Sequence, residues 1–302
     1  MSSTVLELAE QATREMGLAV PTSLVGNSNL DATQILGLLN ACGKELVSDF
    51  QWQAITIEYR FTTAYYSYTG STTDAAVTVS SMSSISNLST DFMVTGTGIN
   101  QDTYVSDSTG SSVILTQAAS ETATGSTLTF SQTKYSLPSD YDRQIDRTNW
   151  DKTSHWELLG PKDAQQWQWL KSGWIATGPR VRYRILGNKF QIWPPLGANR
   201  YFGFEYVSNF WVTATGGTST SKTSFTVDTD TCIFPDRVMV LFLKKKYFEV
   251  KGFDATAFTK DFNRELDSAK AADAGSATLN MAPRVNQYLI GWDNIPDSGY
   301  GP

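Results

Sequence analysis

The sequence predicts an α+β protein, with helices near both ends of the chain and an antiparallel β region between them. Apolar residues recur at helical spacing over residues 5–50 and 235–273, whereas alternating, aromatic-rich runs occupy residues 55–68 and 180–212. The third observation is a Ser/Thr-rich, low-complexity stretch, residues 70–133, in which 28 of 64 residues are Ser or Thr. Together these observations favour a helical bundle joined to a β-sheet region that carries a small inserted β-rich module.

Two helices are predicted at the N-terminus. Thr4 and Glu7 have capping-box spacing, and the apolar residues that follow recur at helical intervals as far as Gly17, which can end the helix. After a loop of residues 21–29, Asp31 begins a second predicted helix that ends near residue 52. Its apolar residues form one face, so we expect both helices to pack in the same bundle.

A predicted strand over residues 55–68 leads into the module of residues 70–133. Short β-branched or aromatic runs at 92–95, 103–106, 112–115 and 127–130 are separated by Gly-containing turns. A disordered linker is the alternative for this composition, but the regular runs favour strands. About 60 residues is marginal for independent stability, so the host must support the module. Its charges are limited to five acids: Asp74, Asp91, Asp102, Asp107 and Glu121.

Residues 150–211 hold seven of the nine tryptophans. Gly160-Pro161 can open a short helix through Leu170, because proline suits the first helical position. Residues 180–185 and 189–193 alternate around a two-residue turn, which predicts a hairpin with Ile185 opposite Phe190 and one face in the core. A long strand is expected over 201–212 and a shorter one over 223–227.

Two further helices are predicted at the C-terminal end, from Pro235 to about residue 273 with a break near Gly252. The final segment is rich in Gly, Pro and Asn but keeps apolar side chains, which is typical of a docking tail. The predicted organisation is a core of residues 1–69 and 134–275, the module of 70–133 and an extended tail of 276–302. The tail residues expected to bind a partner are Arg284, Tyr288, Leu289, Ile290 and Trp292.

The composition excludes several classes of partner. The net charge is −6 with a pI near 4.9, which argues against strong electrostatic binding to phosphate backbones or anionic membranes. The longest apolar run, residues 238–243, falls far short of the roughly 20 residues of a membrane span. We therefore expect a protein made in the cytoplasm, without membrane contact. Cys42 and Cys232 lie in apolar surroundings and are predicted to be buried thiols rather than a disulfide or metal pair.

No catalytic, cofactor or metal site is expected. His155 is the sole histidine, which excludes a multi-histidine metal site and favours an ordinary structural or surface residue. A cluster of three carboxylates with two arginines could suggest glycoside hydrolysis, with Glu157 as a further candidate, but an ion-paired loop is the better interpretation. The cluster consists of Asp140, Asp142, Asp146, Arg143 and Arg147.

Three other features suggest binding surfaces. Arg180, Arg182 and Arg184 share one strand face, with Trp193 opposite Arg182. This face could contact nucleic acid, but such a face is usually solvated or paired with acids, and its functional alternative is a subunit interface. Lys244–Lys246 fan out on a helix and are expected to be solvated. The tryptophans could bind sugars, but most are expected to be core or interface residues because neighbours such as 167 and 169 cannot share a helical face.

The order of these pieces resembles a known family. The chain has two N-terminal helices, a strand leading to an insert, the segment Leu137-Pro138-Ser139-Asp140-Tyr141-Asp142-Arg143, the arginine hairpin and two C-terminal helices. In this order they look like the head-to-tail adaptors, or tail tubular protein A, of short-tailed bacteriophages. The resemblance covers residues 1–69 and 134–275. The inserted module is similar to β modules that recur in phage structural proteins, and it is a departure from the shorter family members.

The resemblance implies a structural virion protein of the head-tail junction. It implies a homo-oligomeric ring, a dodecamer, that binds the portal protein through the C-terminal tail, meets a tail nozzle of the tail tubular protein B kind, and lets DNA pass without sequence-specific binding. We hypothesise that the module projects outward to a tail fibre or an adjoining tail ring. The alternative functions are a carbohydrate-binding virion surface module and, more remotely, a hydrolase.

Overall fold

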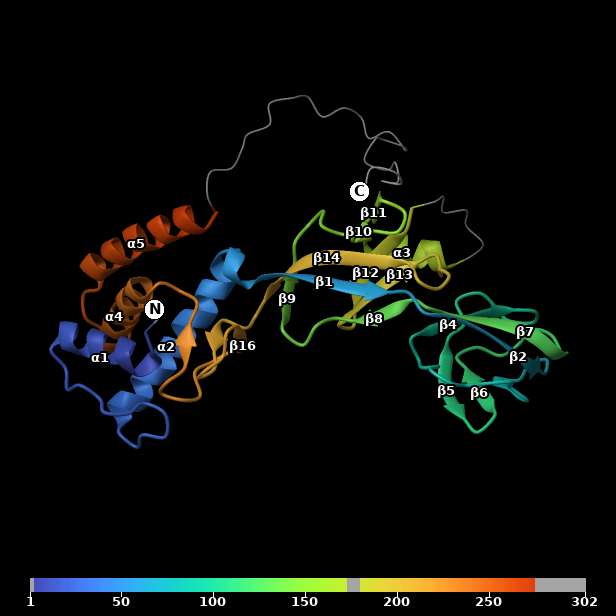
Figure 1. The fold of residues 1–302 in the computed structure, drawn as a ribbon, viewed down its shortest axis with the longest axis horizontal. Helices are drawn as coiled ribbons and strands as arrows, with labels where there is room; N and C mark the ends of the chain where they lie inside the picture. Colours follow the sequence, from blue (N-terminus) through green and yellow to red (C-terminus); the bar gives the residue numbers. More distant parts are fainter. Residues whose placement is uncertain (1–2, 173–179, 275–302) are drawn as a thin grey trace, which may run out of the picture. The chain divides into compact units, whose positions relative to one another are not determined.

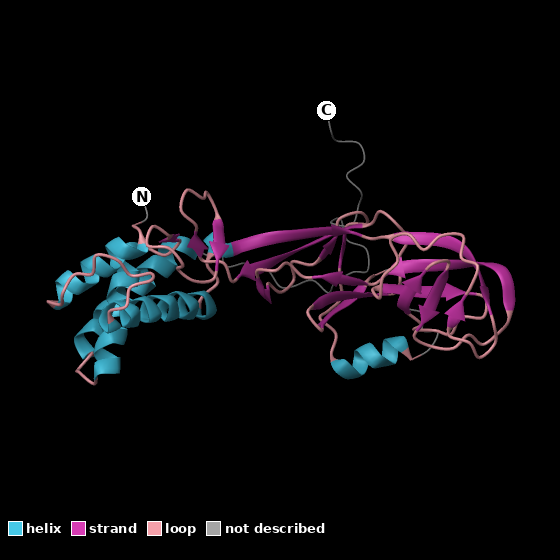
Figure 2. Ribbon diagram, turned by 90° about the horizontal axis from the view of Figure 1, so that it is seen from below, coloured by secondary structure: helices cyan, strands magenta, loops and turns pink. Residues whose placement is uncertain are grey.

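The computed structural model describes residues 3–172 and 180–274, and the chain divides into two compact units. The first, here called the helical unit, contains the described chain as far as Ile57, Asp140–Gln144 and the chain from Tyr206 to the last described helix. The second, the β unit, contains Glu58–Ser139 and Ile145–Glu205. Figure 2 shows helices gathered in the first unit, and strands with one short described helix in the second. The predicted α+β class is confirmed.

The helical unit is built from α1 (Val5–Met16), α2 (Leu30–Asp49), α4 (Asp236–Lys251) and α5 (Thr256–Ala274) (Figure 1). Helix α4 contacts each of the other three. Its residues 238–243 are all buried, which is the pattern of a helix enclosed by neighbours on every side. Helix α4 is therefore the central element of this unit.

The ends of the N-terminal helices follow the predicted signals with one exception. The side chain of Thr4 accepts the Glu7 N–H at 3.3 Å, the Glu7 carboxylate accepts the Thr4 N–H at 2.7 Å, and Gly17 ends α1 with φ of +71°. Helix α2 begins at Leu30 rather than Asp31. The reason is that the Asn29 side chain accepts the Asp31 N–H at 2.9 Å and so occupies the capping position.

A small sheet completes the helical unit, with β15 (Val212–Thr213) between β16 (Thr220–Lys222) and β17 (Thr231–Cys232). The short strand predicted over residues 223–227 is wrong. The N–H groups of Phe225, Thr226 and Val227 are instead taken by the side chains of Asn40 and Asp230. A segment whose donors bond to side chains cannot use them to pair with a strand.

Two sheets face each other in the β unit. One has the order β1 (Thr56–Thr62), β14 (Tyr201–Ser208), β10 (Trp150–Asp151), β11 (Trp156–Glu157), and the last residues of β14 pair with β9 (Tyr141–Gln144) in the helical unit. The other has the order β12 (Arg182–Leu186), β13 (Lys189–Trp193), β8 (Lys134–Ser136). The ring of Phe190 lies 5.1 Å from Phe204 and 5.6 Å from Phe61 between centroids, so an aromatic core joins the two sheets.

The predicted hairpin register is confirmed, with Ile185 opposite Phe190 and Arg182 opposite Trp193. Helix α3 (Ala164–Lys171), however, begins later than expected at Gly160-Pro161. Asp163 is its cap and accepts the Gln166 N–H at 2.6 Å. Residues 159–162 hydrogen-bond along the edge of β12 instead.

Residues 70–133 are folded, and the linker alternative is wrong. Strand β7 (Ala123–Gln132) lies between β2 (Tyr65–Thr72) and β4 (Phe92–Gly96), and β6 (Ser112–Leu115) lies between β3 (Thr78–Val79) and β5 (Val105–Thr109). The strand expected over 55–68 is thus two strands, β1 and β2. The two small sheets share a buried core of Val79, Met82, Phe92, Val94, Val105, Val113, Leu115, Leu128 and Phe130. The proposed boundaries at 70 and 133 stay a prediction.

Candidate functional site

The arginines of the predicted subunit interface lie on or beside β12. Arg182 and Arg184 are half-buried on one face of the strand. Arg180 precedes the strand, with its guanidinium carbon 5.0 Å from the ring centroid of Trp156. Arg182 and Arg184 therefore share a sheet face, as the alternation predicts.

Trp193 was expected on this surface, and here the expectation is wrong. The side chain is 4% exposed and packs in a buried cluster with Met93, Tyr104, Trp167 and Leu170. Two of these residues come from the module and two from α3, so both elements cover that end of the sheet face. Trp193 joins the module to its host and is not available to another subunit.

The face that bears the arginines carries two more cations. Arg184 lies opposite Gln191, which lies opposite Lys134, and Leu186 lies opposite Lys189, so these side chains project from the same side of the sheet. We call Lys134, Arg182, Arg184 and Lys189 the basic face.

Acids of the module already form ion pairs with the basic face and with the adjacent helix α3. Asp91 forms an ion pair with Lys189, and Asp102 lies 2.9 Å from Lys171 of α3. The Nζ atoms of Lys134 and Lys171 lie 3.9 and 5.1 Å from the ring centroid of Tyr104. Burial lowers the pKa of Lys134, with Lys171 adding to the effect. Carboxylates and one aromatic ring therefore fasten the module to its host.

Trp169 is the surface residue that sequence reasoning did not select. It is 59% exposed, whereas Trp167 two residues earlier is 2% exposed. Together with Lys162, Gln166 and Arg182, Trp169 lines a shallow pocket of about 270 Å³. The signal was present in the helical spacing, because residues two apart point to different sides of a helix.

The predicted ion-paired loop contributes to the helical unit. Asp140 accepts hydrogen bonds from the hydroxyl groups of Tyr206 at 3.0 Å and Ser208 at 2.6 Å. Its carbonyl accepts the Asn209 N–H at 2.7 Å. The Asp140 carboxylate is thus bound by hydroxyl groups rather than by an arginine, and it holds β14 in place.

Arg143 forms the ion pair that the sequence predicted, with Asp142 at 2.7 Å. The same guanidinium donates to the carbonyls of Val47 and Phe50, at 3.0 and 3.1 Å. These carbonyls lie at the C-terminal end of α2, where backbone acceptors lack partners within the helix. The loop therefore caps a helix with a cation, which is a structural role.

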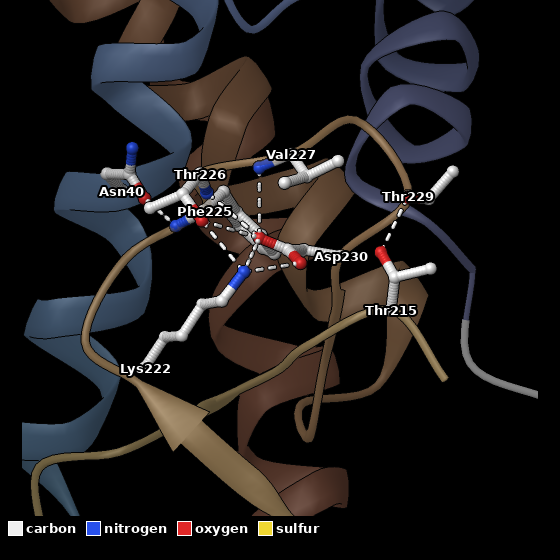
Figure 3. Close-up of polar contacts among 8 residues, drawn as sticks. All are labelled: Asn40, Thr215, Lys222, Phe225, Thr226, Val227, Thr229 and Asp230. Carbon is white, nitrogen blue, oxygen red and sulfur yellow. Dashed lines mark hydrogen bonds and ion pairs between the residues drawn. The ribbon is translucent and has the colours of Figure 1, made fainter. Parts of the chain in front are cut away.

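A buried carboxylate, Asp230, organises the loop after β16 (Figure 3). It is fully buried and accepts hydrogen bonds from the Lys222 ammonium at 2.9 Å and from the N–H groups of Thr226 and Val227 at 2.9 and 3.0 Å. Burial raises the pKa of Asp230, but the bonds from Lys222 and the backbone outweigh it, and the net pKa is lowered.

The same loop binds three other parts of the helical unit. The Asp230 carbonyl accepts the Val5 N–H of α1 at 2.8 Å. Asp228 accepts the Val25 N–H at 2.7 Å, and Asn40 of α2 accepts the Phe225 N–H at 2.8 Å. The Asp230 network therefore fixes α1, the loop before α2 and α2 itself around residues 222–230, and its polar groups are engaged in internal contacts.

Comparison with known protein families decides the identity of the chain. Residues 108–285, more than half of the sequence, match the model of the SU10 adaptor protein family. The chain belongs to this family of phage adaptors. No curated protein matches the sequence. The family makes the chain a structural component of a virion, which implies a non-enzymatic role.

Helix α4 of the adaptor corrects one sequence expectation. Lys244–Lys246 were expected to be solvated, but Lys244 is only 8% exposed and lies 2.9 Å from Glu15 of α1. Lys246 lies 2.9 Å from Glu45 of α2, and Lys245 lies 5.2 Å from the ring centroid of Phe262 on α5. Successive residues are about 100° apart on a helix, so each lysine meets a different neighbour of α4.

The described part of the adaptor shows no grouping of His, Cys, Asp and Glu that could hold a metal ion. Cys42 and Cys232 are buried thiols, as predicted, and burial raises the pKa of Cys232 to about 12. His155 lies in a turn and is half-buried. None of the described helices combines the length and apolarity that crossing a membrane requires.

The predicted docking tail of the adaptor lies outside the described residues. This applies to Arg284, Tyr288, Leu289, Ile290 and Trp292. Their role in binding stays a prediction.

Proposed function

We propose that this adaptor is of the tail tubular protein A kind and joins the portal to the tail nozzle of a short-tailed phage, as a ring that leaves a passage for DNA. The family match over residues 108–285 carries the proposal. It spans the host strands from β8 to β14, but not β1, as well as α4 and α5, and the sequence resemblance also covers these parts.

The geometry supports a function based on shape. The most buried carboxylate of the helical unit, Asp230, is occupied by Lys222 and backbone donors, and Asp140 is occupied by hydroxyl groups. The net charge of −6 suits the wall of a DNA passage, because an acidic surface repels the phosphate backbone and does not retain it. DNA would therefore pass without sequence-specific binding.

The proposed partners are the portal, reached by residues 276–302, a nozzle protein of the tail tubular protein B kind, and eleven further copies in the ring. Light scattering after size-exclusion chromatography, on the chain alone and mixed with the portal of the same genome, tests this. We expect a ring-sized mass alone or with the portal. A persistent monomer that ignores the portal would refute the proposal.

Truncation after Ala274 separates portal binding from folding. The truncated chain should keep its circular dichroism and unfolding transition but lose the portal, because the tail is the proposed contact. Unfolding of the truncated chain would instead assign the tail to the core.

The module is proposed to reach a tail fibre in addition. Binding of the isolated fibre protein to the unassembled chain, measured with and without residues 72–131, tests this contact independently of ring formation. Equal binding by both chains would contradict it.

Sugar binding is the weaker alternative. It requires several tryptophans exposed on one plane, but among the described tryptophans only Trp169 is exposed, while Trp52, Trp167, Trp193 and Trp211 are buried.

A further inference from the structure

We propose that the module of one copy docks on the arginine end of the basic face of the next copy. This inference rests on the proposed ring and names the surfaces that join its subunits. The occupant of the surface is thus a second copy of the same chain, presented through acidic and aliphatic side chains of the module.

Charge is unevenly distributed within the β unit. Residues 70–133 contain five acidic residues and no Lys or Arg, whereas residues 145–205 contain nine basic and five acidic residues, a net charge of +4. One chain therefore carries two surfaces of opposite sign. Such surfaces attract each other and select against contacts between like surfaces.

The chain already uses this complementarity internally. The ion pairs Asp91–Lys189 and Asp102–Lys171 attach acids of the module to the basic part of the host. Asp74, Asp107 and Glu121 remain exposed on the module. The internal contact between module and host pairs acids with lysines, and the proposed contact between copies pairs acids with basic residues in the same way. It uses the three acids that the internal contact leaves exposed.

The outer face of the module combines charge with apolar area. Asp107 of β5 lies opposite Ile114 of β6, which lies opposite Thr78 of β3, so the three side chains form one row across the sheet. Ile114 is 37% exposed, and the neighbouring Val77 is 43% exposed. This row faces away from the buried core, which lies under Val79, Val105 and Val113 on the other face.

The host offers a matching surface. Arg184 is half-buried on the basic face, and Leu186, on the same side of β12, is 45% exposed. Lys162 and the exposed Trp169 continue the surface past Arg182. Basic groups beside an exposed Leu and Trp complement acidic groups beside an exposed Ile and Val.

The two surfaces are not joined within one chain. Asp107 and Arg184 both belong to the β unit, and in the described structure no ion pair joins them. Two different patches that bind each other give a head-to-tail contact, which closes into a ring when its rotation allows. This geometry is the one that the proposed adaptor needs.

Cross-linking between two single-cysteine variants tests the contact. Arg184→Cys and Asp107→Cys chains are mixed, assembled with the portal, and treated with a flexible bismaleimide. The native thiols are buried and will not compete. We expect covalent dimers in the mixture and not in either variant alone. In the control, Ser86→Cys replaces Asp107→Cys. Ser86 is exposed and lies beside β2, which belongs to the other sheet of the module, so it is outside the proposed contact.

Charge reversal provides a second measurement. Arg184→Asp alone and Asp107→Arg alone should each raise the protein concentration needed for assembly about tenfold, equivalent to about 1.4 kcal/mol, and the double variant should restore it. Rings that form normally with cross-linking no higher than in the Ser86→Cys control would overturn this contact and leave the ring adaptor standing. A wild-type chain that never reaches ring mass would overturn both.

Discussion

The ammonium group of Lys244 lies 2.9 Å from the carboxylate of Glu15, and this ion pair joins the central helix α4 to α1. Arg237 shares the same carboxylate at 2.7 Å. Burial raises the pKa of Glu15, but hydrogen bonds from Lys244 and Gln11, together with the charges of Lys244 and Arg237, outweigh it, so the net pKa is lowered. The pair matters because Lys244 is 8% exposed, so water could not solvate its ammonium group if the Glu15 carboxylate were removed.

Glu15→Ala should destabilise the adaptor by about 2 kcal/mol, because it leaves the buried Lys244 ammonium without its carboxylate. Urea unfolding followed by circular dichroism measures the loss. Glu10→Ala on the same helix is the control, since its partner Arg14 is exposed, and it should cost less than about 0.5 kcal/mol. Equal losses from the two variants would show that Lys244 does not depend on Glu15.

Gly43→Ala should destabilise the helical unit by about 1–3 kcal/mol through overpacking. A Cβ at Gly43 would lie 2.1 Å from the ring of the buried Trp211. Gly37→Ala, on the same helix with nothing within 4 Å of the added Cβ, should instead stabilise by up to about 1 kcal/mol. Thermal unfolding of both variants provides the comparison, and a stabilised Gly43→Ala protein would mean that Trp211 can move aside.

Asp230→Asn should cost about 3 kcal/mol at pH 7, because it leaves Lys222 without its charged partner in a buried network. The pKa of Asp230 is lowered by folding, so its contribution is complete above the unfolded pKa of about 3.9 and is lost as pH falls through the folded pKa. The stability difference between wild type and variant should therefore shrink as the pH falls below about 4.

Urea titrations at several pH values test this dependence. Asp107→Asn makes the same charge change at an exposed site and serves as the control. A difference between wild type and Asp230→Asn that stays constant into acid would contradict the role assigned to the Lys222–Asp230 pair.

Trp169→Ala should leave stability within about 0.5 kcal/mol of wild type, whereas Trp167→Ala should cost about 3–5 kcal/mol. The two residues differ in exposure, 59% against 2%. Chemical unfolding gives both values. Trp169→Ala should also weaken ring assembly, because Trp169 belongs to the proposed host surface, and unchanged assembly would remove it from that surface.

Local signals predicted most of the elements. The capping box at Thr4 and Glu7 gave the start of α1, and the two-residue turn at Gly187-Asn188 gave the hairpin register. Both work because the interacting residues are close in sequence. The loop over 223–227 could not be predicted in the same way, since its hydrogen-bond acceptors include Asn40, 185 residues away from Phe225.

The surfaces were harder to predict than the elements. Alternation placed Arg182, Arg184 and Trp193 on one face correctly, but it could not show that α3 and the module cover Trp193. Helical spacing separated Lys244 from its two neighbours without showing that Glu15 lies beside it. Exposure of a side chain depends on which distant segment packs over it, and no local pattern records that.

The pairing of β2 with β7 has a consequence for the gene. Gly70 lies opposite Ser126, so the strand that enters the module and the strand that leaves it are hydrogen-bonded neighbours. Two crossovers, one in the codons of each of these strands, can exchange the module while β1 and β8 of the host keep their positions. The surface that the module presents can in this way change without redesign of the adaptor core.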